Sequence, residues 1–129
     1  MKLSGPFSSG AAVQSGGAGT GTANTDTGIT FNGLLHGVYI QYEGSPPAGT
    51  TDVTIATKGN GIPEAAVTLL EISNAATDGW FFPRLLTVSA AAANNTDDYD
   101  EYPVHDQINV KIAQANTDDY VQVWFAFSD

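Results

Sequence analysis

The sequence has no cysteine and few basic residues, and both shortages limit what the protein can do. Without cysteine there are no disulfides, no thiolate metal ligands and no cysteine nucleophile. Four Lys and Arg residues stand against 14 Asp and Glu residues, for a formal net charge of −10. Nucleic-acid affinity comes largely from neutralising phosphates with basic side chains, so we expect no nucleic-acid partner. The same charge disfavours binding to anionic membrane surfaces.

Long apolar runs are also lacking. No stretch approaches the roughly 18 apolar residues that a membrane-spanning helix needs. Residues 1–10 include one lysine but no apolar core of a secretory signal peptide. We therefore expect no membrane association, and synthesis in a cytoplasm.

Recognisable catalytic motifs are missing as well. The two histidines, His36 and His105, do not have zinc-binding spacing, and no Gly-x-Ser-x-Gly turn presents a nucleophile. The glycines near the N-terminus are not followed by the Lys-Ser/Thr of a phosphate-binding loop. The sequence thus predicts a protein that is not an enzyme and uses no cofactor.

Residues 1–28 are rich in glycine, serine and threonine and hold seven of the 14 glycines. Their large apolar side chains are Leu3, Phe7 and Val13. Ordering a glycine-rich backbone is costly, and this composition offers no continuous hydrophobic face. We expect a flexible, extended N-terminal arm that is either disordered or becomes ordered on a neighbouring subunit through these three partner-binding side chains.

Residues 29–129 show the period-two alternation of apolar and polar residues that is typical of half-buried strands. The clearest series lie at residues 38–42, 107–113 and 121–127. Turn signals separate them, and no window has convincing helical periodicity. The pattern predicts an all-β domain, an antiparallel β-sandwich of Greek-key or jelly-roll type.

One apolar segment is less easily assigned. Residues 67–72 are apolar on both faces, which predicts a central strand covered on two sides. The alternative is a helix over residues 62–71.

The densest negative charge lies at Asp97, Asp98, Asp100 and Glu101. Clustered carboxylates are the ligands that Ca²⁺ requires, although the spacing is not that of an EF-hand loop. The run is therefore a weak candidate for a calcium site, and otherwise a solvated acidic loop.

Aromatic residues are the strongest indication of a binding surface. Trp80 and Phe81 are followed by Phe82, and a strand cannot point three neighbouring side chains inward. Trp124 alternates with the apolar residues of the last predicted strand. We expect Trp80, Phe81 and Trp124 to bind a partner, because exposed aromatics mark interaction surfaces. The alternative is a second apolar layer covered by a loop or by the arm.

Several segments follow one another in a characteristic order. They are the glycine-rich lead-in and residues 37–42, 51–55, 78–84, 106–110 and 121–127. This order resembles small virion structural proteins of tailed bacteriophages, of the capsid decoration or cement type, over residues 29–129. The resemblance implies a β-sandwich on the outside of the phage head, with a virion localisation. It also implies a homo-oligomer, with a trimer favoured, that bridges major capsid proteins.

A second hypothesis starts from the aromatic residues alone. A β-sandwich with Trp80, Trp124 or a tyrosine as a sugar platform would be a carbohydrate-binding module, lectin-like or from a fibre. Calcium at residues 97–101 could then assist sugar binding.

Overall fold

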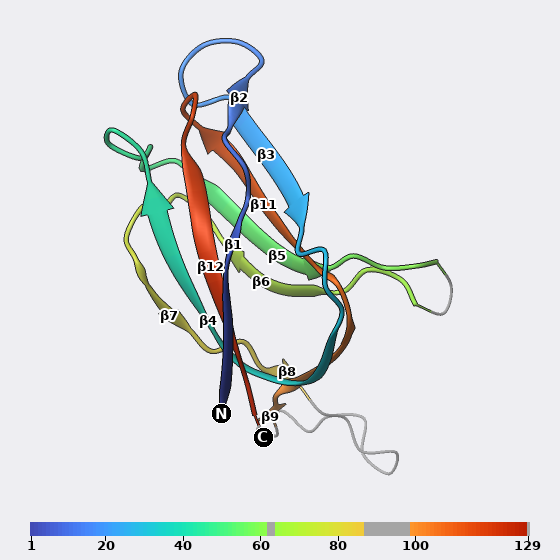
Figure 1. Cartoon of the computed structure of the whole chain (residues 1–129). Coiled ribbons are helices and arrows are strands. Elements are labelled where there is room, and N and C mark those ends of the chain that lie inside the picture. Colours follow the sequence, from blue (N-terminus) through green and yellow to red (C-terminus); the bar gives the residue numbers. More distant parts are fainter. Residues whose placement is uncertain (62–63, 87–98, 129) are drawn as a thin grey trace.

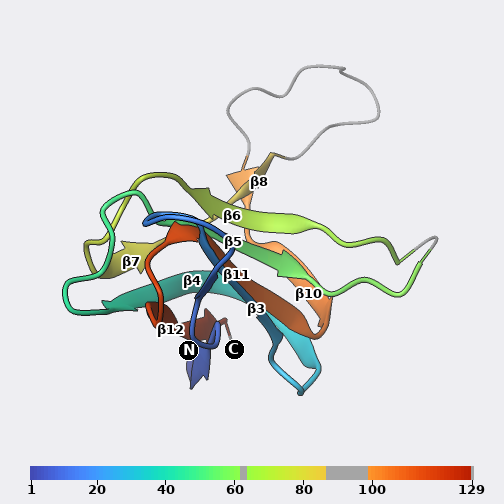
Figure 2. The ribbon, with the colours of Figure 1, turned by 90° about the horizontal axis from the view of Figure 1, so that it is seen from above.

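The computed structural model describes residues 1–61, 64–86 and 99–128, and every regular element in those ranges is a β-strand. Two five-stranded antiparallel sheets pack face to face (Figures 1 and 2). Sheet A consists of β1 (Lys2–Ser8), β12 (Tyr120–Phe127), β4 (Phe31–Glu43), β10 (Tyr102–Asp106) and β7 (Gly79–Phe81). Sheet B consists of β2 (Val13–Gln14), β3 (Gly21–Asp26), β11 (Ile108–Ala115), β5 (Asp52–Thr57) and β6 (Thr68–Ile72). The predicted antiparallel β-sandwich is confirmed.

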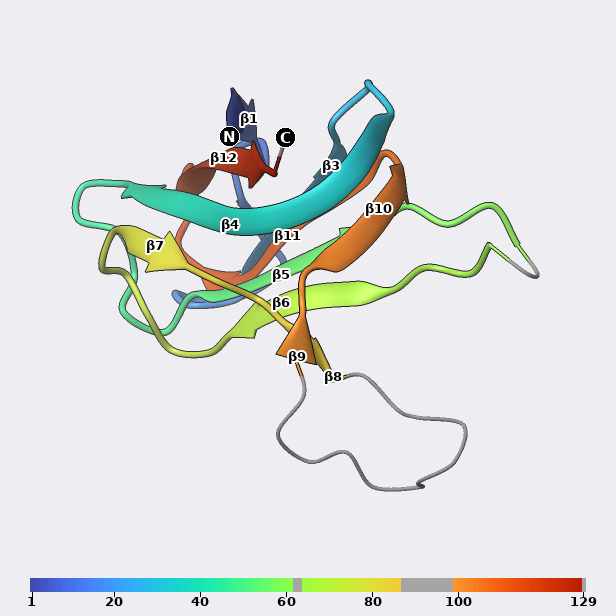
Figure 3. The ribbon, with the colours of Figure 1, turned by 90° about the horizontal axis from the view of Figure 1, so that it is seen from below.

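A small ribbon completes the described elements. It pairs β8 (Leu85–Leu86) with β9 (Tyr99–Asp100) below the two sheets (Figure 3). No helix in the described part of the chain could cross a membrane.

The strands pair from the two ends of the chain inward. β1 pairs with β12, β3 with β11, β4 with β7 and β10, and β5 with β6. One long hairpin, rolled up so that its paired segments fall alternately in the two sheets, produces this order. Of the two predicted topologies, the observed one is therefore the jelly roll.

The core follows the predicted alternation. Many inward side chains of the four central strands, β4, β5, β11 and β12, are at most 1 % exposed; they include Val38, Ile40, Val53, Ile55, Ile108, Val110, Ile112, Val121, Val123 and Phe125. Burying a side chain of this kind contributes roughly 1.5–3 kcal/mol relative to leaving it in water. These two facing apolar surfaces hold the sheets together, and they leave the outer faces available for other contacts.

Residues 1–28 form part of the sandwich, and the expected extended arm is not confirmed. β1 pairs with β12 from Lys2 to Ser8, and β3 pairs with β11. Ser9 and Ala12 are buried, and the Phe7 ring lies 5.6 Å from the Phe31 ring. The expectation rested on the small number of apolar side chains. An edge strand is also stabilised by backbone hydrogen bonds, which glycine, serine and threonine form as well as larger residues do.

The prediction of a central strand at residues 67–72 was wrong. β6 lies at the edge of sheet B and pairs with β5. Leu69 is its buried side chain, while Leu70 and Ile72 are partly buried against the core and Val67 is exposed. Partial cover at a sheet edge therefore explains why this segment is apolar on both faces. The alternative helix over residues 62–71 is not observed at residues 68–71, which belong to the strand.

Candidate functional site: an aromatic row on the outer face of sheet A

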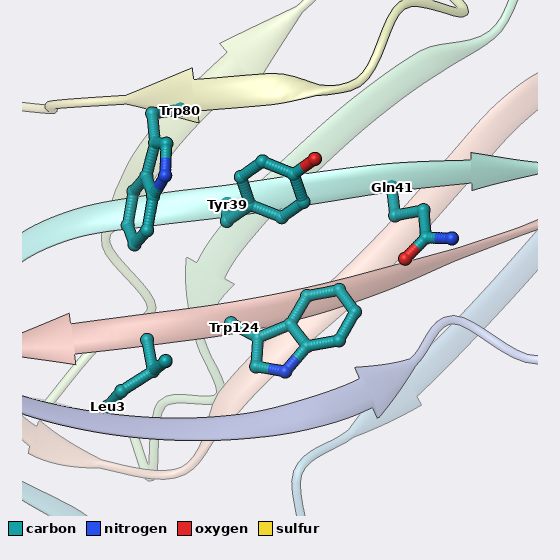
Figure 4. Close-up of a pocket in the computed structure, with 5 residues that line it drawn as sticks. All are labelled: Leu3, Tyr39, Gln41, Trp80 and Trp124. Atoms are coloured by element: carbon teal, nitrogen blue, oxygen red, sulfur yellow. The ribbon is translucent and has the colours of Figure 1, made fainter.

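Three aromatic side chains form a row across the outer face of sheet A. Trp124 on β12 pairs with Tyr39 on β4, and Tyr39 pairs with Trp80 on β7. The ring centroids of Trp124 and Tyr39 are 5.7 Å apart, and those of Tyr39 and Trp80 are 5.5 Å apart, both in edge-to-face geometry. Figure 4 shows the three rings on neighbouring strands. Because backbone pairing sets their positions, the rings of this aromatic row are held in line before any partner binds.

The row continues beyond Trp80. The Phe82 ring stacks on the Trp80 indole at 6.0 Å with an interplanar angle of 10°. His36 contacts the Phe82 ring edge-to-face at 5.6 Å. Trp80 is 44 % exposed and Phe82 is 54 % exposed. The most accessible rings therefore lie toward the β7 edge of the sheet.

Two open hollows border the aromatic row. Leu3, Tyr39, Gln41, Trp80 and Trp124 line the first, which has a volume of about 380 Å³ (Figure 4). Leu3 is 58 % exposed and brings β1 into the same surface. Met1, His36, Trp80 and Phe82 line the second hollow, of about 340 Å³. Trp80 belongs to both, so its indole separates two adjacent places where a partner side chain could enter.

Two glycines make room for these rings. A Cβ on Gly5 of β1 would lie 2.9 Å from Cδ1 of Trp124 and 2.8 Å from the carbonyl oxygen of Val123. A Cβ on Gly37 of β4 would lie 3.1 Å from the Phe82 ring. The backbone of β1 and β4 therefore approaches the aromatic side chains more closely than a residue with a Cβ would allow.

The outer face becomes acidic toward the other end of β4. The side-chain amide of Gln41 donates a hydrogen bond of 2.6 Å to Oε1 of Glu43. Glu43, Asp118 and Asp119 line a polar hollow of about 410 Å³ with Tyr120. Aromatic and acidic surfaces thus follow one another along the same two strands.

The structure brings together three of the six predicted partner-binding residues, namely Leu3, Trp80 and Trp124. Phe81 is instead partly buried against the core, and so is Phe7. Val13 lies on β2 of sheet B and is 72 % exposed.

Three aromatic members of this surface were not among the predicted partner-binding residues, namely Tyr39, Phe82 and His36. The signal for Tyr39 was present, because it alternates with the buried residues Val38 and Ile40 and must therefore point outward.

The weak calcium candidate at residues 97–101 lies only partly within the described residues. Asp97 and Asp98 lie outside the described residues. Oδ1 of Asp100 accepts a hydrogen bond from the backbone N–H of Glu101. Within the described ranges, no three His, Asp or Glu side chains are grouped so that they could hold a metal ion.

The Glu101 carboxylate is part of a local hydrogen-bond cluster. It accepts a hydrogen bond of 2.7 Å from the Ser128 hydroxyl and lies 2.8 Å from Nδ1 of His36. These two contacts, first Ser128 and then His36, hold the pKa of Glu101 below its ordinary value. Arg84 donates to the backbone carbonyl of His36 at 2.8 Å. The cluster joins β4 to the C-terminal residues and fixes His36 beside Phe82.

The geometry of the aromatic row is suited to adhesion. Exposed Trp and Tyr side chains are the residue types most often responsible for binding energy at protein interfaces. Here paired strands hold them, so binding costs less conformational entropy than it would for a loop. Comparison of the chain with protein-family models, with curated proteins and with solved structures finds no match.

Proposed function

We propose that this protein is a structural virion protein, a capsid decoration or cement protein on the outside of a phage head. In this role it stabilises contacts between major capsid proteins. The observation that carries the proposal is the aromatic row on the outer face, in which Trp80 is exposed and Tyr39 and Trp124 are half-buried; Leu3 borders it, and four paired strands of sheet A hold it. The jelly-roll topology is also compatible with it, because viral capsid domains use this architecture.

The physical argument concerns how a small domain gains enough contact energy. A stable interface buries about 800 Å² on each partner, with a few aromatic residues supplying most of the energy. Trp80, Trp124 and Leu3 provide such a centre on one face. A homotrimer, the oligomeric state that the proposal favours, would present three copies of this face. Linked binding of that kind raises overall affinity without new contacts.

The experiment compares phage heads that carry the wild-type protein with heads that carry Trp80→Ala or Trp124→Ala variants. Truncating an interface tryptophan typically weakens binding by about 2 kcal/mol or more. We therefore expect low occupancy of both variants by cryo-electron microscopy, and heads that rupture at a lower temperature. Val13→Ala is the matched control, because Val13 is an exposed apolar side chain on sheet B. Particles that lack the wild-type protein, or occupancy that is equal for all variants, would contradict the proposal.

A second candidate function is carbohydrate binding by the same surface. It is favoured by one observation, namely that the Gln41 side chain lies in the hollow bordered by two indoles and a phenol (Figure 4). Sugar rings stack on aromatic faces, and an amide can bond their hydroxyls. Saturable quenching of tryptophan fluorescence by a neutral oligosaccharide would support this function. Flat titrations against a glycan panel would eliminate it.

A further inference from the structure

The outer face of sheet A changes its chemistry in a regular way along its two central strands. Three successive outward-facing pairs join β12 to β4, namely Trp124–Tyr39, Gln122–Gln41 and Tyr120–Glu43. The first pair belongs to the aromatic row, and the third lines the acidic hollow. A partner that follows these strands would therefore meet aromatic rings first and carboxylates next.

One carboxylate at the acidic end, that of Asp119, is occupied by hydrogen bonds to the backbone. Asp119 is buried and accepts hydrogen bonds of 3.0 Å from the backbone N–H groups of Ala48 and Asn116. Asp118 is exposed, and Glu43 is half-buried with its Oε1 bonded to Gln41. Glu43 and Asp118 are therefore the two carboxylates that a partner can approach.

The distance between the aromatic row and the acidic hollow matches the side-chain spacing of an extended chain. Tyr39 and Glu43 are four residues apart on β4, which corresponds to about 13 Å in a strand. In a partner segment that is also extended, side chains four residues apart point to the same side at the same spacing.

We propose that this face binds an extended basic segment of a partner protein that carries two Arg or Lys side chains four residues apart. One cation lies in the hollow against Tyr39, Trp80 and Trp124, where cation–π attraction favours it. The other meets Glu43 and Asp118 in the acidic hollow. The net charge of −10 attracts such a segment over a longer range. The inference rests on the proposed function and specifies the chemistry of the capsid partner.

The chain supplies its own reporter for this surface. Its two tryptophans are Trp80 and Trp124, both in the aromatic row, so intrinsic fluorescence reports on this face. The probe is the capped peptide Gly-Arg-Thr-Ser-Thr-Arg-Gly added to the full-length protein. We expect a saturable fluorescence change. Replacing both arginines by citrulline, which is neutral and of nearly the same shape, is expected to weaken binding about five- to thirtyfold.

Two further comparisons test the geometry. A peptide with the arginines three residues apart places them on opposite sides of the strand, so it is expected to bind as weakly as a peptide with a single arginine. In the protein, Glu43→Gln is expected to weaken binding of the original peptide about two- to fivefold. Glu71→Gln is the matched control, because it removes the same charge from an exposed position on β6 of sheet B and should leave binding unchanged.

The outcomes separate this inference from the proposed function. Equal binding of the arginine and citrulline peptides, or no saturable change up to about 1 mM peptide, would overturn the inference. So would a response to a neutral oligosaccharide such as maltohexaose without one to the arginine peptide. On phage heads, a Glu43→Gln variant that binds with the same occupancy as the wild type would leave the decoration role standing and overturn the proposed basic partner. Absence of the wild-type protein from heads would remove the decoration role itself.

Discussion

The Glu101 carboxylate lies 2.8 Å from Nδ1 of His36 and 2.7 Å from the hydroxyl of Ser128. These contacts favour the ionised carboxylate and lower its pKa in the folded protein. A lowered pKa means that the stabilisation is present above pH 4.5, the ordinary value, and is lost as the pH falls through the folded-state value.

We therefore predict that Glu101→Gln makes the protein less stable at neutral pH and flattens the loss of stability below pH 4.5. Urea unfolding of the variant and the wild type across this range measures both effects. Ser128→Ala removes the larger contribution, so NMR titration should give a Glu101 pKa closer to its ordinary value. Parallel pH profiles for Glu101→Gln and the wild type would contradict the prediction.

Phe7 tests whether the first strand belongs to the fold. Its ring contacts the rings of Phe31 and Phe125, with centroids 5.6 and 5.8 Å away. Because Phe7 is only partly buried, we expect Phe7→Ala to lower the free energy of unfolding by about 2–3 kcal/mol. Val13→Ala truncates an apolar side chain on β2 that is 72 % exposed, and it should change stability by less than about 0.5 kcal/mol. Equally small decreases in melting temperature for Phe7→Ala and Val13→Ala would instead indicate that β1 does not pack on the rest of the fold.

Gly5 has a φ of +145° and lies against Val123 and Trp124. An alanine there combines an unfavourable backbone conformation with a Cβ 2.8 Å from a backbone oxygen. We predict that Gly5→Ala destabilises the protein by about 1–3 kcal/mol and shifts the tryptophan emission, because the Trp124 indole must move. Gly49→Ala is the control, since nothing lies within 4 Å of a Cβ at that position. Identical melting temperatures for the two variants would refute this account.

Tyr42 has a buried hydroxyl for which the described part of the chain offers no hydrogen-bond partner. Burial, and secondarily the charge of Asp78, raise the pKa of Tyr42 above 10.0. The unfolded chain therefore ionises first, and stability falls as the pH rises above that ordinary value.

Tyr42→Phe removes the unpaired buried hydroxyl and, with it, the group that ionises at high pH. We therefore expect equal stability or a gain of up to about 1 kcal/mol at neutral pH. The variant should also lose less stability than the wild type in alkaline urea titrations. A loss of more than about 1 kcal/mol at neutral pH would show that the hydroxyl has a partner.

The sequence predicted the parts of the fold that depend on side-chain alternation. The buried series in β11 and β12 were identified because every second residue is apolar and the others are polar. β1 and β3 were not identified, because their contribution is backbone pairing at or near the edges of sheets. Such pairing leaves little trace in residues such as Gly21 and Thr22.

The candidate site, like the fold, could be predicted from the sequence only in part. Outward positions for Trp80 and Trp124 could be predicted from each strand by itself. That Tyr39 lies between them could not, because it depends on the register of three strands that are distant in sequence. Phe81 was assigned to the surface with Trp80, although adjacent residues in a strand point to opposite faces and Phe81 therefore faces the core.

The pairing of β1 with β12 affects how the protein is made. β1 leaves the ribosome before the other described strands, and its partner β12 follows all of them. Until β12 has been synthesised, the aromatic row is therefore incomplete, because Trp124 and the strand that pairs with Leu3 are still missing. A nascent chain that still lacks β12 consequently cannot present this surface to a partner.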